Sequence, residues 1–334
     1  RGMLPYIKSD LVVLTHKQHA NRPSWLPLNV RVVKKKSIEG AYHILTSQMI
    51  YFTHGVSKYF VPINRKRQCV INLWHGMPLK NIGYLDGKKR VSEAHYTIAT
   101  SPFFQGLMAN SFRMSEESVI ISGLPRNEIL TSKTTNSELT SIDEKFDEIF
   151  VWLPTYRASI DGDVRLDGKE LPLLGFDNFN IEKLNEVLKD INAVLYVKPH
   201  PMSFYREDDF GGLSNVFVVD ELWLSDKSIT LYELLSISDE LWTDFSSVYI
   251  DYLLLGKKIK FVINDLEEYS DSRGFTFDVV REGFPGELIQ SESELFASIL
   301  DRPSFPVKYD EERYHSLKSF DFTLLEDIND DQKR

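Results

Sequence analysis

The sequence of 334 residues has little cysteine and no long apolar run. Cys69 is the only cysteine, so no disulfide can form within the chain, and this usage is typical of a reducing compartment. Because no run of about eighteen apolar residues occurs, we expect no membrane-spanning helix. The chain begins at Arg1 without a methionine, and we expect it to be a piece of a longer polypeptide.

Several motifs of familiar chemistry are also absent. The sequence has no Walker-type phosphate loop, no dinucleotide fingerprint and no Gly-x-Ser-x-Gly nucleophile elbow. Its one cysteine and scattered histidines lack the spacing of a zinc site, and no convincing pair of carboxylates indicates a glycosidase. What remains is chemistry that depends on cations and hydrogen-bond donors.

Acidic residues are scarce in the first 90 positions, which hold three of them against 16 lysines and arginines. This part therefore carries a net charge of +13, and the remainder must carry −23 for the chain to total −10. The basic residues cluster at 34–36, 65–67 and 88–90. Such a surface attracts polyanions, namely nucleic acid, anionic lipid or a phosphate polymer. A solvated basic face without a partner is the alternative, and the abrupt change of sign favours a functional surface.

Short apolar runs alternate with amphipathic stretches, which is typical of α/β layering. In the first half we expect strands at 10–14, 30–33, 49–52, 69–73, 96–100 and 118–122, and helices at 37–45 and 102–110. In the second half we expect strands at 149–153, 193–198, 216–219, 240–243 and 259–263, and helices at 181–192, 230–236 and 246–255. The polar stretch 131–147 has no apolar period and is interpreted as linker. The pattern predicts two Rossmann-like domains that face a cleft.

The first cluster with chemical potential follows a predicted buried strand, where CVINL at 69–73 runs into WHGMPLK at 74–80. Ligands of open α/β sheets bind outside the carboxyl ends of the strands. His75 is therefore expected where chemistry takes place, with the cation of Lys80 five residues further on. On spacing alone, a histidine that simply closes a core strand is the competing interpretation.

Further clusters place cations and hydroxyls at other strand ends. They are SGLPRN at 122–127, LPTYR at 153–157, VKPHP at 197–201, TDFSSV at 243–248 and RG at 273–274. Together they suit a phosphorylated, nucleotide-activated substrate. Arg273 has a structural alternative, since it can pair with a carboxylate at 265, 267 or 268.

The TDFSSV cluster has a physical mechanism for binding an anion. Ser246 or Ser247 can cap the helix that follows, and the first-turn amides together with the helix dipole attract negative charge. An ordinary helix cap is the alternative. Asp244 would repel a phosphate placed directly in this site, so we expect it to orient a neighbour or to contact a ribose or another hydroxyl.

Six of these motifs in this order, over about residues 30–280, resemble the CDP-glycerol glycerophosphotransferase family of teichoic acid primases, polymerases and related capsule polymerases. The resemblance implies a GT-B-like architecture of two Rossmann-like domains with the active site in the cleft between them. We accordingly expect an N-terminal acceptor- and membrane-facing domain at 1–130, a linker at 131–148, a CDP-polyol-binding domain at 149–310 and a C-terminal tail at 311–334.

The resemblance also implies the reaction and the roles of the site residues. A polyol phosphate, glycerol phosphate first of all, passes from a CDP-polyol to a hydroxyl of a teichoic-acid-like or capsular acceptor, and CMP is released. His75 matches the general base, and His200, the second catalytic histidine, matches the one that contacts the donor phosphates. Substrate binding falls to Lys80, Arg126, Arg157, Lys198, Asp244, Ser246, Ser247 and Arg273. No cofactor is required, although Mg²⁺ can assist.

Three positions depart from the family pattern: Met77 replaces a common threonine, Tyr156 a tryptophan and Phe245 a tyrosine. The departures fit a subfamily with another polyol or acceptor. CDP-ribitol is thus an alternative donor, and a GT-B glycosyltransferase that uses a nucleotide sugar is an alternative enzyme. A polyanion-binding protein without catalysis is the alternative from another class. We expect a polyol-phosphate or glycan acceptor, lipid-linked acceptors included, no nucleic acid, and a cytoplasmic enzyme held by its basic half on the anionic inner face of the bacterial membrane.

Overall fold

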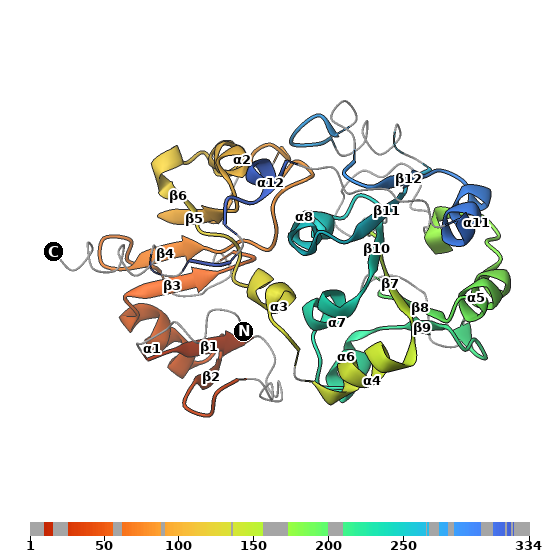
Figure 1. Ribbon diagram of the computed structural model, residues 1–334. Coiled ribbons are helices and arrows are strands. Elements are labelled where there is room, and N and C mark those ends of the chain that lie inside the picture. The colour runs from red at the N-terminus through yellow and green to blue at the C-terminus, as the bar shows by residue number, and fades with distance from the viewer. Residues whose placement is uncertain are drawn as a thin grey trace. The chain divides into compact units, whose positions relative to one another are not determined.

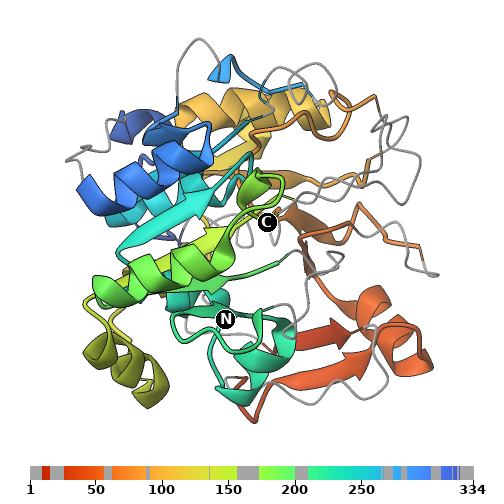
Figure 2. The ribbon, with the colours of Figure 1, turned by 90° about the vertical axis from the view of Figure 1, so that its right-hand side faces the viewer.

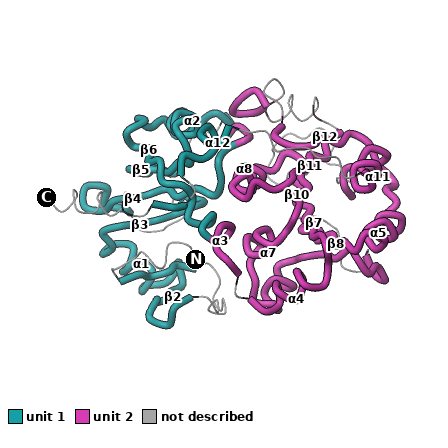
Figure 3. Tube along the Cα trace, in the orientation of Figure 1, with its two compact units in different colours: residues 1–78, 82–128, 310–334 teal, residues 79–81, 129–309 magenta. Residues whose placement is uncertain are grey.

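Two compact units, each built on parallel β-sheet, make up the chain (Figure 3). Unit 1 contains residues 1–78, 82–128 and 310–334, and unit 2 contains residues 79–81 and 129–309. The computed structural model describes residues 10–15, 26–55, 62–87, 91–134, 136–155, 173–199, 210–264, 266, 274–279, 284–301, 310–317, 319–321 and 323. The two units are described separately below.

The main sheet of unit 1 has four parallel strands in the order β3-β4-β5-β6 (Figure 1). They are β3 (Met49–Phe52), β4 (Cys69–Asn72), β5 (Tyr96–Ala99) and β6 (Val119–Ile121). All four residues of β4 are buried, as expected for a strand with a neighbour on each side. A separate parallel pair is formed by β1 (Val12–Thr15) and β2 (Arg31–Lys34).

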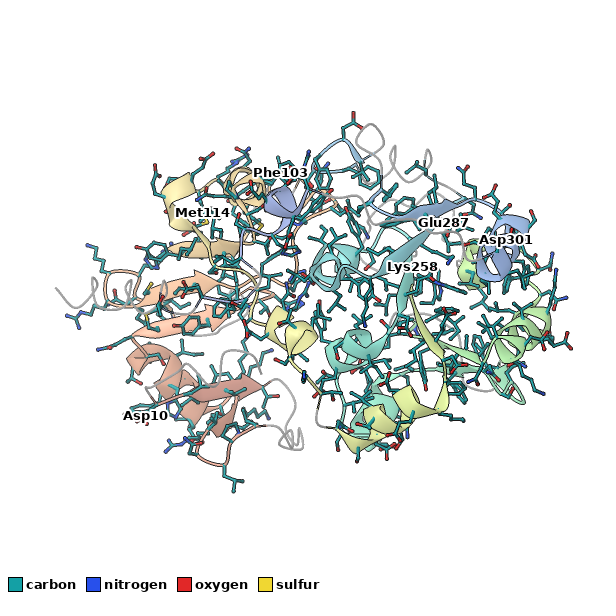
Figure 4. All side chains as sticks on the ribbon, in the orientation of Figure 1. Asp10, Phe103, Met114, Lys258, Glu287 and Asp301 are labelled. Atoms are coloured by element: carbon teal, nitrogen blue, oxygen red, sulfur yellow. The ribbon has the colours of Figure 1, made fainter. Side chains whose placement is uncertain are left out.

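The helices of unit 1 begin at capping residues that the sequence makes visible. Helix α1 (Ile38–Thr46) starts after Ser37, whose hydroxyl accepts from the Gly40 amide. Helix α2 (Pro102–Phe112) starts after Ser101, whose hydroxyl accepts from the Phe104 amide, and has proline in its first turn. Phe103 and Met114 are labelled near the two ends of α2 in Figure 4. The expected Ser101 cap is confirmed.

Unit 2 contains a six-stranded parallel sheet in the order β12-β11-β10-β7-β8-β9. The strands are β7 (Glu148–Leu153), β8 (Ala193–Val197), β9 (Val216–Val218), β10 (Glu240–Thr243), β11 (Lys258–Val262) and β12 (Glu287–Ile289). Alternate residues face opposite layers. Phe150 and Trp152 of β7 pack in a core that includes residues of α5 (Ile181–Asp190) and α11 (Glu292–Asp301). Figure 2 shows both of these helices on the same side of the sheet.

Helices α7 (Leu231–Ile237) and α8 (Val248–Tyr252) lie on the other face of this sheet. Tyr249 of α8 makes an edge-to-face contact with Phe261 of β11, with ring centroids 5.1 Å apart. Helix α7 starts with a reciprocal capping box between Thr230 and Glu233. A parallel sheet covered by helices on both faces confirms the predicted α/β class.

Several elements were missed by the sequence pattern, and most of them are short or polar. The stretch interpreted as linker contains α4 (Ser137–Lys145), capped by Asn136 and anchored by the buried Leu139. The expected tail contains α12 (Glu311–Tyr314), and residues 310–334 group with unit 1. There the Ser316 amide donates to the carbonyl of Thr100. Also missed were α3 (Asn127–Thr131), α6 (Glu221–Asp226), β12 and α11.

Candidate active site

The loop after β4 has a constrained backbone. Trp74 has φ +49°, which is uncommon for a bulky residue, and Gly76 has φ +133°, a region that favours glycine. The buried Asn72 side chain accepts a hydrogen bond from the Trp74 amide at 3.0 Å. The structure around the loop must hold this unusual conformation, because an isolated chain would avoid it. The result is that His75 follows the carboxyl end of β4, an inner strand of the sheet, as predicted.

The tautomer of His75 follows from its hydrogen bond. Its Nδ1 lies 2.9 Å from the carbonyl oxygen of Thr53. A carbonyl can only accept, so Nδ1 carries the hydrogen and Nε2 of the neutral ring is the nitrogen with an acceptor lone pair. The His75 side chain is exposed. These features match what a general base needs, namely an exposed ring with a defined tautomer.

Two aromatic rings contact the His75 imidazole. The His54 ring is parallel to it, with centroids 4.4 Å apart and an interplanar angle of 6°. The Trp74 ring lies 4.1 Å away at 31°, and Trp74 in turn meets Phe112 of α2 edge-on at 5.0 Å. Both stacked and edge-on geometries are favourable for aromatic pairs. The imidazole is therefore oriented by ring contacts as well as by its hydrogen bond.

Arg126 is joined to the histidine loop although 51 residues separate the two positions. Gly123, which has φ +71°, turns the chain after β6, and a β-carbon there would lie 3.0 Å from the Ser319 carbonyl oxygen. Pro125 and Arg126 then lead directly into α3. The Arg126 Nη1 donates to the carbonyl of His75 at 2.5 Å. The predicted base and one predicted phosphate-binding arginine are thus in contact within unit 1.

Lys80 belongs to unit 2, where the chain passes at 79–81. It forms an antiparallel bridge with Phe275, and the Thr276 amide donates to the Leu79 carbonyl at 3.0 Å. A β-carbon on Gly274 would lie 2.6 Å from Nδ2 of Asn81, so these backbones approach closely. Two motifs almost 200 residues apart are therefore neighbours. Arg273 itself lies outside the described residues.

Asp244 is fully buried and orients a neighbouring motif. Its Oδ1 accepts from the amide of Thr155 at 2.8 Å and from the Thr155 hydroxyl at 2.6 Å. These contacts agree with one of the two roles expected for Asp244, the orientation of a neighbour. The TDFSSV turn and the LPTYR strand end are therefore held together. Arg157, two residues beyond Thr155, lies outside the described residues.

The two serines after Asp244 are partly exposed, whereas Phe245 is buried against Phe275 and Phe284. The helix expected over 246–255 is shorter: α8 has five residues and is followed by a 3₁₀ turn at Leu253–Leu255. Ser247 occupies the cap position without a capping hydrogen bond from its side chain. Ser246 Oγ lies 3.5 Å from the Val248 amide. The anion-binding role of both serines stays a prediction.

Lys198 was predicted to bind substrate, and the structure places it in an ion pair. Its Nζ lies 3.0 Å from Oε1 of Glu221, and the lysine side chain is 8% exposed against 75% for the glutamate. The amide of Lys198 donates to the Trp152 carbonyl. Because the buried cation already has a carboxylate partner, the contacts favour a structural role for it. His200 lies outside the described residues.

Three residues near His75 were missed by the sequence analysis. Thr53 and His54 follow β3 at a strand end that has no distinctive motif. Asn72 was interpreted as part of an apolar run. The signal that could have found Asn72 is its polar side chain inside a fully buried strand. Nothing local links Thr53 or His54 to His75, because β3 and β4 become neighbours only in the sheet.

A second histidine near β4 has a structural role. His95 Nδ1 accepts from the Val70 amide at 3.0 Å, and its Nε2 donates to the Arg65 carbonyl at 3.0 Å. Burial, and secondarily the positive charge of Arg65, lower the pKa of His95. Burial also raises the pKa of the Cys69 thiol to about 11. Neither group is suited to act as the base.

Among the described residues, no group of three or more His, Cys, Asp or Glu side chains is arranged to hold a metal ion. In the same part of the chain, every helix is too short or too polar to cross a bilayer.

Comparisons with known proteins place these motifs in context. Residues 6–323 match the model of the CDP-glycerol:poly(glycerophosphate) glycerophosphotransferase family. A teichoic acid glycerol-phosphate transferase of Staphylococcus aureus is 28% identical, with 78% of this chain and 74% of that protein covered. A teichoic acid ribitol-phosphate primase of Bacillus spizizenii is also 28% identical, over 71% of this chain and 62% of the primase, less than two thirds of its length.

A solved structure of the wall teichoic acid polymerase TagF is similar with a TM-score of 0.71. The match covers 99% of this chain and 82% of that chain at 22% sequence identity. At this identity the likeness shows the fold alone. The predicted GT-B-like α/β fold with two Rossmann-like units is confirmed.

Proposed function

The chain belongs to the CDP-glycerol:poly(glycerophosphate) glycerophosphotransferase family, and on this premise we propose that it transfers a polyol phosphate from a CDP-polyol to an acceptor hydroxyl. Glycerol phosphate is the proposed group, and a teichoic-acid-like or capsular polymer, free or lipid-linked, is the proposed acceptor. The observation that carries the proposal is the His75–Thr53 hydrogen bond, which fixes a proton-accepting Nε2 at the carboxyl end of β4.

The proposed reaction is an in-line displacement. His75 Nε2 takes the proton of the acceptor hydroxyl while the acceptor oxygen bonds to the phosphorus that bears the polyol. The bond from that phosphorus to the oxygen bridging to the cytidylyl phosphate breaks, and CMP leaves with the bridging oxygen. Such transfers depend mainly on positioning and on neutralising charge on the phosphoryl oxygens. We assign this second task to cations and hydroxyls of the family motifs: Lys80, Arg126, Arg157, His200, Ser246, Ser247 and Arg273.

The test measures CMP release from CDP-glycerol and from CDP-ribitol, each with and without a polyol-phosphate acceptor. Acceptor-dependent CMP from one donor supports the proposal and identifies the polyol. His75→Ala serves as the inactive variant, and His43→Ala serves as its matched control, because His43 lies on α1 of the same unit and contacts Arg31 instead. If His75→Ala kept full turnover, the base assignment would be wrong. If a nucleotide sugar were the donor used, the alternative glycosyltransferase would be established.

We propose further that transfer needs no resident metal ion, because the family motifs supply their positive charge through arginines, lysines and a histidine. Turnover should then survive chelation by EDTA, and added Mg²⁺ should change it only modestly. Complete loss of activity in EDTA that Mg²⁺ restores would overturn this part of the proposal while leaving the reaction class in place.

We also propose that unit 1 docks on an anionic membrane surface, which would place the enzyme at the inner face of the cell membrane. Helix α1 supports this. Its buried residues are Gly40 and Ile44, whereas Ile38, Tyr42 and Leu45 are 91%, 62% and 53% exposed. Those three residues recur at helical spacing on one face. The exposed basic residues Arg31 and Lys36 precede the helix in sequence.

An exposed apolar helix face beside lysine and arginine is the pattern of an interfacial helix on anionic lipid. The test compares sedimentation with phosphatidylcholine vesicles that contain or lack phosphatidylglycerol. Ile38→Ser combined with Leu45→Ser should lower binding to anionic vesicles at least about tenfold, since each aliphatic side chain contributes roughly 1.5–3 kcal/mol when buried. The matched control changes Leu222 and Leu300, exposed leucines of unit 2, to serine. Equal binding by both double variants, or binding that salt leaves unchanged, would contradict the docking proposal.

A further inference from the structure

The segment that follows β3 lies against the proposed base. The chain leaves β3 at Phe52, and the next two residues are Thr53 and His54. Strand β3 is paired in parallel with β4, with Phe52 in register with Asn72, so both strands end at the same edge of the sheet. Sheet pairing therefore brings Thr53 and His54 beside His75, 21 or more positions further along the chain.

Thr53 and His54 make complementary contacts with the His75 ring. The Thr53 carbonyl accepts the hydrogen of His75 Nδ1 at 2.9 Å, and the His54 ring stacks on His75 at 4.4 Å and 6°. The Thr53 hydroxyl lies 2.8 Å from His54 Nδ1 and so orients the stacking ring as well. One contact defines which nitrogen carries the hydrogen, and the other defines the plane of the ring.

We propose that His54 is a positioning residue for the transfer reaction and that it acts through His75. This inference rests on the proposed function, in which His75 is the base. A base must point its lone pair along the acceptor O–H bond, and small errors of orientation reduce the rate. Without a ring packed on its face, the exposed imidazole could swing out of its hydrogen bond with Thr53, and it would then also lose the tautomer that this bond selects. The parallel His54 ring limits this movement on one face.

The proposal separates His54 from residues that bind substrate. Loss of the stacking ring should misorient His75 and lower kcat, while leaving the affinity for the donor unchanged. A stacked aromatic pair corresponds to an effect of about two- to tenfold. A flat ring without ionisable nitrogens should replace His54, because the proposed role needs a ring face and no proton transfer.

The experiment compares His54→Ala with His54→Phe, using CMP release for kcat and for the KM of the donor. We expect His54→Ala to lose about two- to tenfold in kcat with the KM unchanged, and His54→Phe to recover most of it. A second readout does not depend on activity: the ring ¹⁵N signals of His75 at about pH 8, where a histidine is neutral. In the wild type they should show the Nδ1–H tautomer, and in His54→Ala a mixture of tautomers. His43→Ala is the control for the loss of a histidine from the same unit.

Either of two outcomes would overturn the inference. One is a His54→Ala variant with wild-type kcat and an unchanged His75 tautomer. The other is a His54→Phe variant as impaired as His54→Ala, which would show that the ring face is not what matters. Failure of the proposed function looks different, because the wild type would then release no acceptor-dependent CMP from either CDP-polyol. A wrong base assignment would instead leave His75→Ala with normal turnover whatever the state of His54.

Discussion

The loop after β4 in unit 1 and the loop after β10 in unit 2 occupy the same position in their sheets, yet they bury different groups. After β4 the ionisable side chain, His75, is exposed, and the polar residue that supports it, Asn72, is buried. After β10 the ionisable side chain, Asp244, is buried, and the two hydroxyl residues beyond it are partly exposed.

The difference separates two chemical tasks. An exposed imidazole with a fixed tautomer is suited to take a proton from a substrate, whereas the buried carboxylate accepts two hydrogen bonds from Thr155 and holds two motifs together. The two hydrogen bonds from Thr155 also occupy an oxygen of Asp244 close to the serines. A carboxylate without such donors would repel an anion bound there. We therefore expect the loop of unit 1 to govern turnover and the loop of unit 2 to govern donor binding.

The sharpest test of this separation compares variants of the two loops. His75→Ala should lower kcat by about 10²–10⁴-fold with a nearly normal KM for the donor, because a positioned base contributes that much. Ser246→Ala combined with Ser247→Ala should instead raise the KM by about tenfold, since each neutral hydrogen bond contributes roughly 0.5–1.5 kcal/mol. Steady-state CMP release measures both parameters. The reverse pattern would break the comparison.

A second test concerns stability rather than turnover. Asp244→Ala removes the acceptor of two hydrogen bonds and leaves the Thr155 amide without it, so unfolding should become easier by about 1–3 kcal/mol. Asp244→Asn keeps a carbonyl oxygen in the same place and should lose less. Denaturant unfolding measures both variants. If Asp244→Ala were as stable as the wild type, the buried carboxylate would not be what holds the two motifs together.

The smallest expected effect is a pH dependence near β4. The pKa of His95 is lowered in the folded chain by burial and then by Arg65, so the unfolded state binds more protons below about pH 6.5. The stability contributed by neutral His95 is present above that pH and is lost as the pH falls through the lowered folded pKa. His95→Asn should flatten this decline in unfolding experiments from pH 8 to pH 5, within the range of about 5–8 where histidines titrate. An identical decline in the variant would assign the dependence to other groups.

Strand positions were predictable because strong local signals coincide there. The apolar runs that became β3, β4, β7 and β10 are bounded by polar or turn residues, and the expected and observed ends agree within a residue or so. Among the elements that were missed, α4 is largely polar and α6 has only six residues, and both helices begin at side-chain caps, Asn136 and Asp220. Periodicity alone cannot detect helices of this kind.

The residues of the candidate site also divide into those that the sequence identified and those that it did not. His75, Arg126 and Asp244 were identifiable from their place at predicted strand ends and from the resemblance to a family. The ion pair of Lys198 with Glu221 was not, because the partner lies on α6, an element the pattern did not predict. The roles of Arg157, His200 and Arg273 stay predictions, since these residues lie outside the described part of the chain.

The amino-acid sequence by itself determined the α/β class, the positions of most strands along the chain and the residue types at the strand ends, because hydrophobic periodicity and turn chemistry are local properties. Only the tertiary structure decided which of those ends meet. The pairing of β3 with β4 sets the Thr53 carbonyl against His75, and the pairing of β7 with β10 sets Thr155 against Asp244. Contacts between residues 22 and 89 positions apart arise from strand order, which local sequence patterns do not encode.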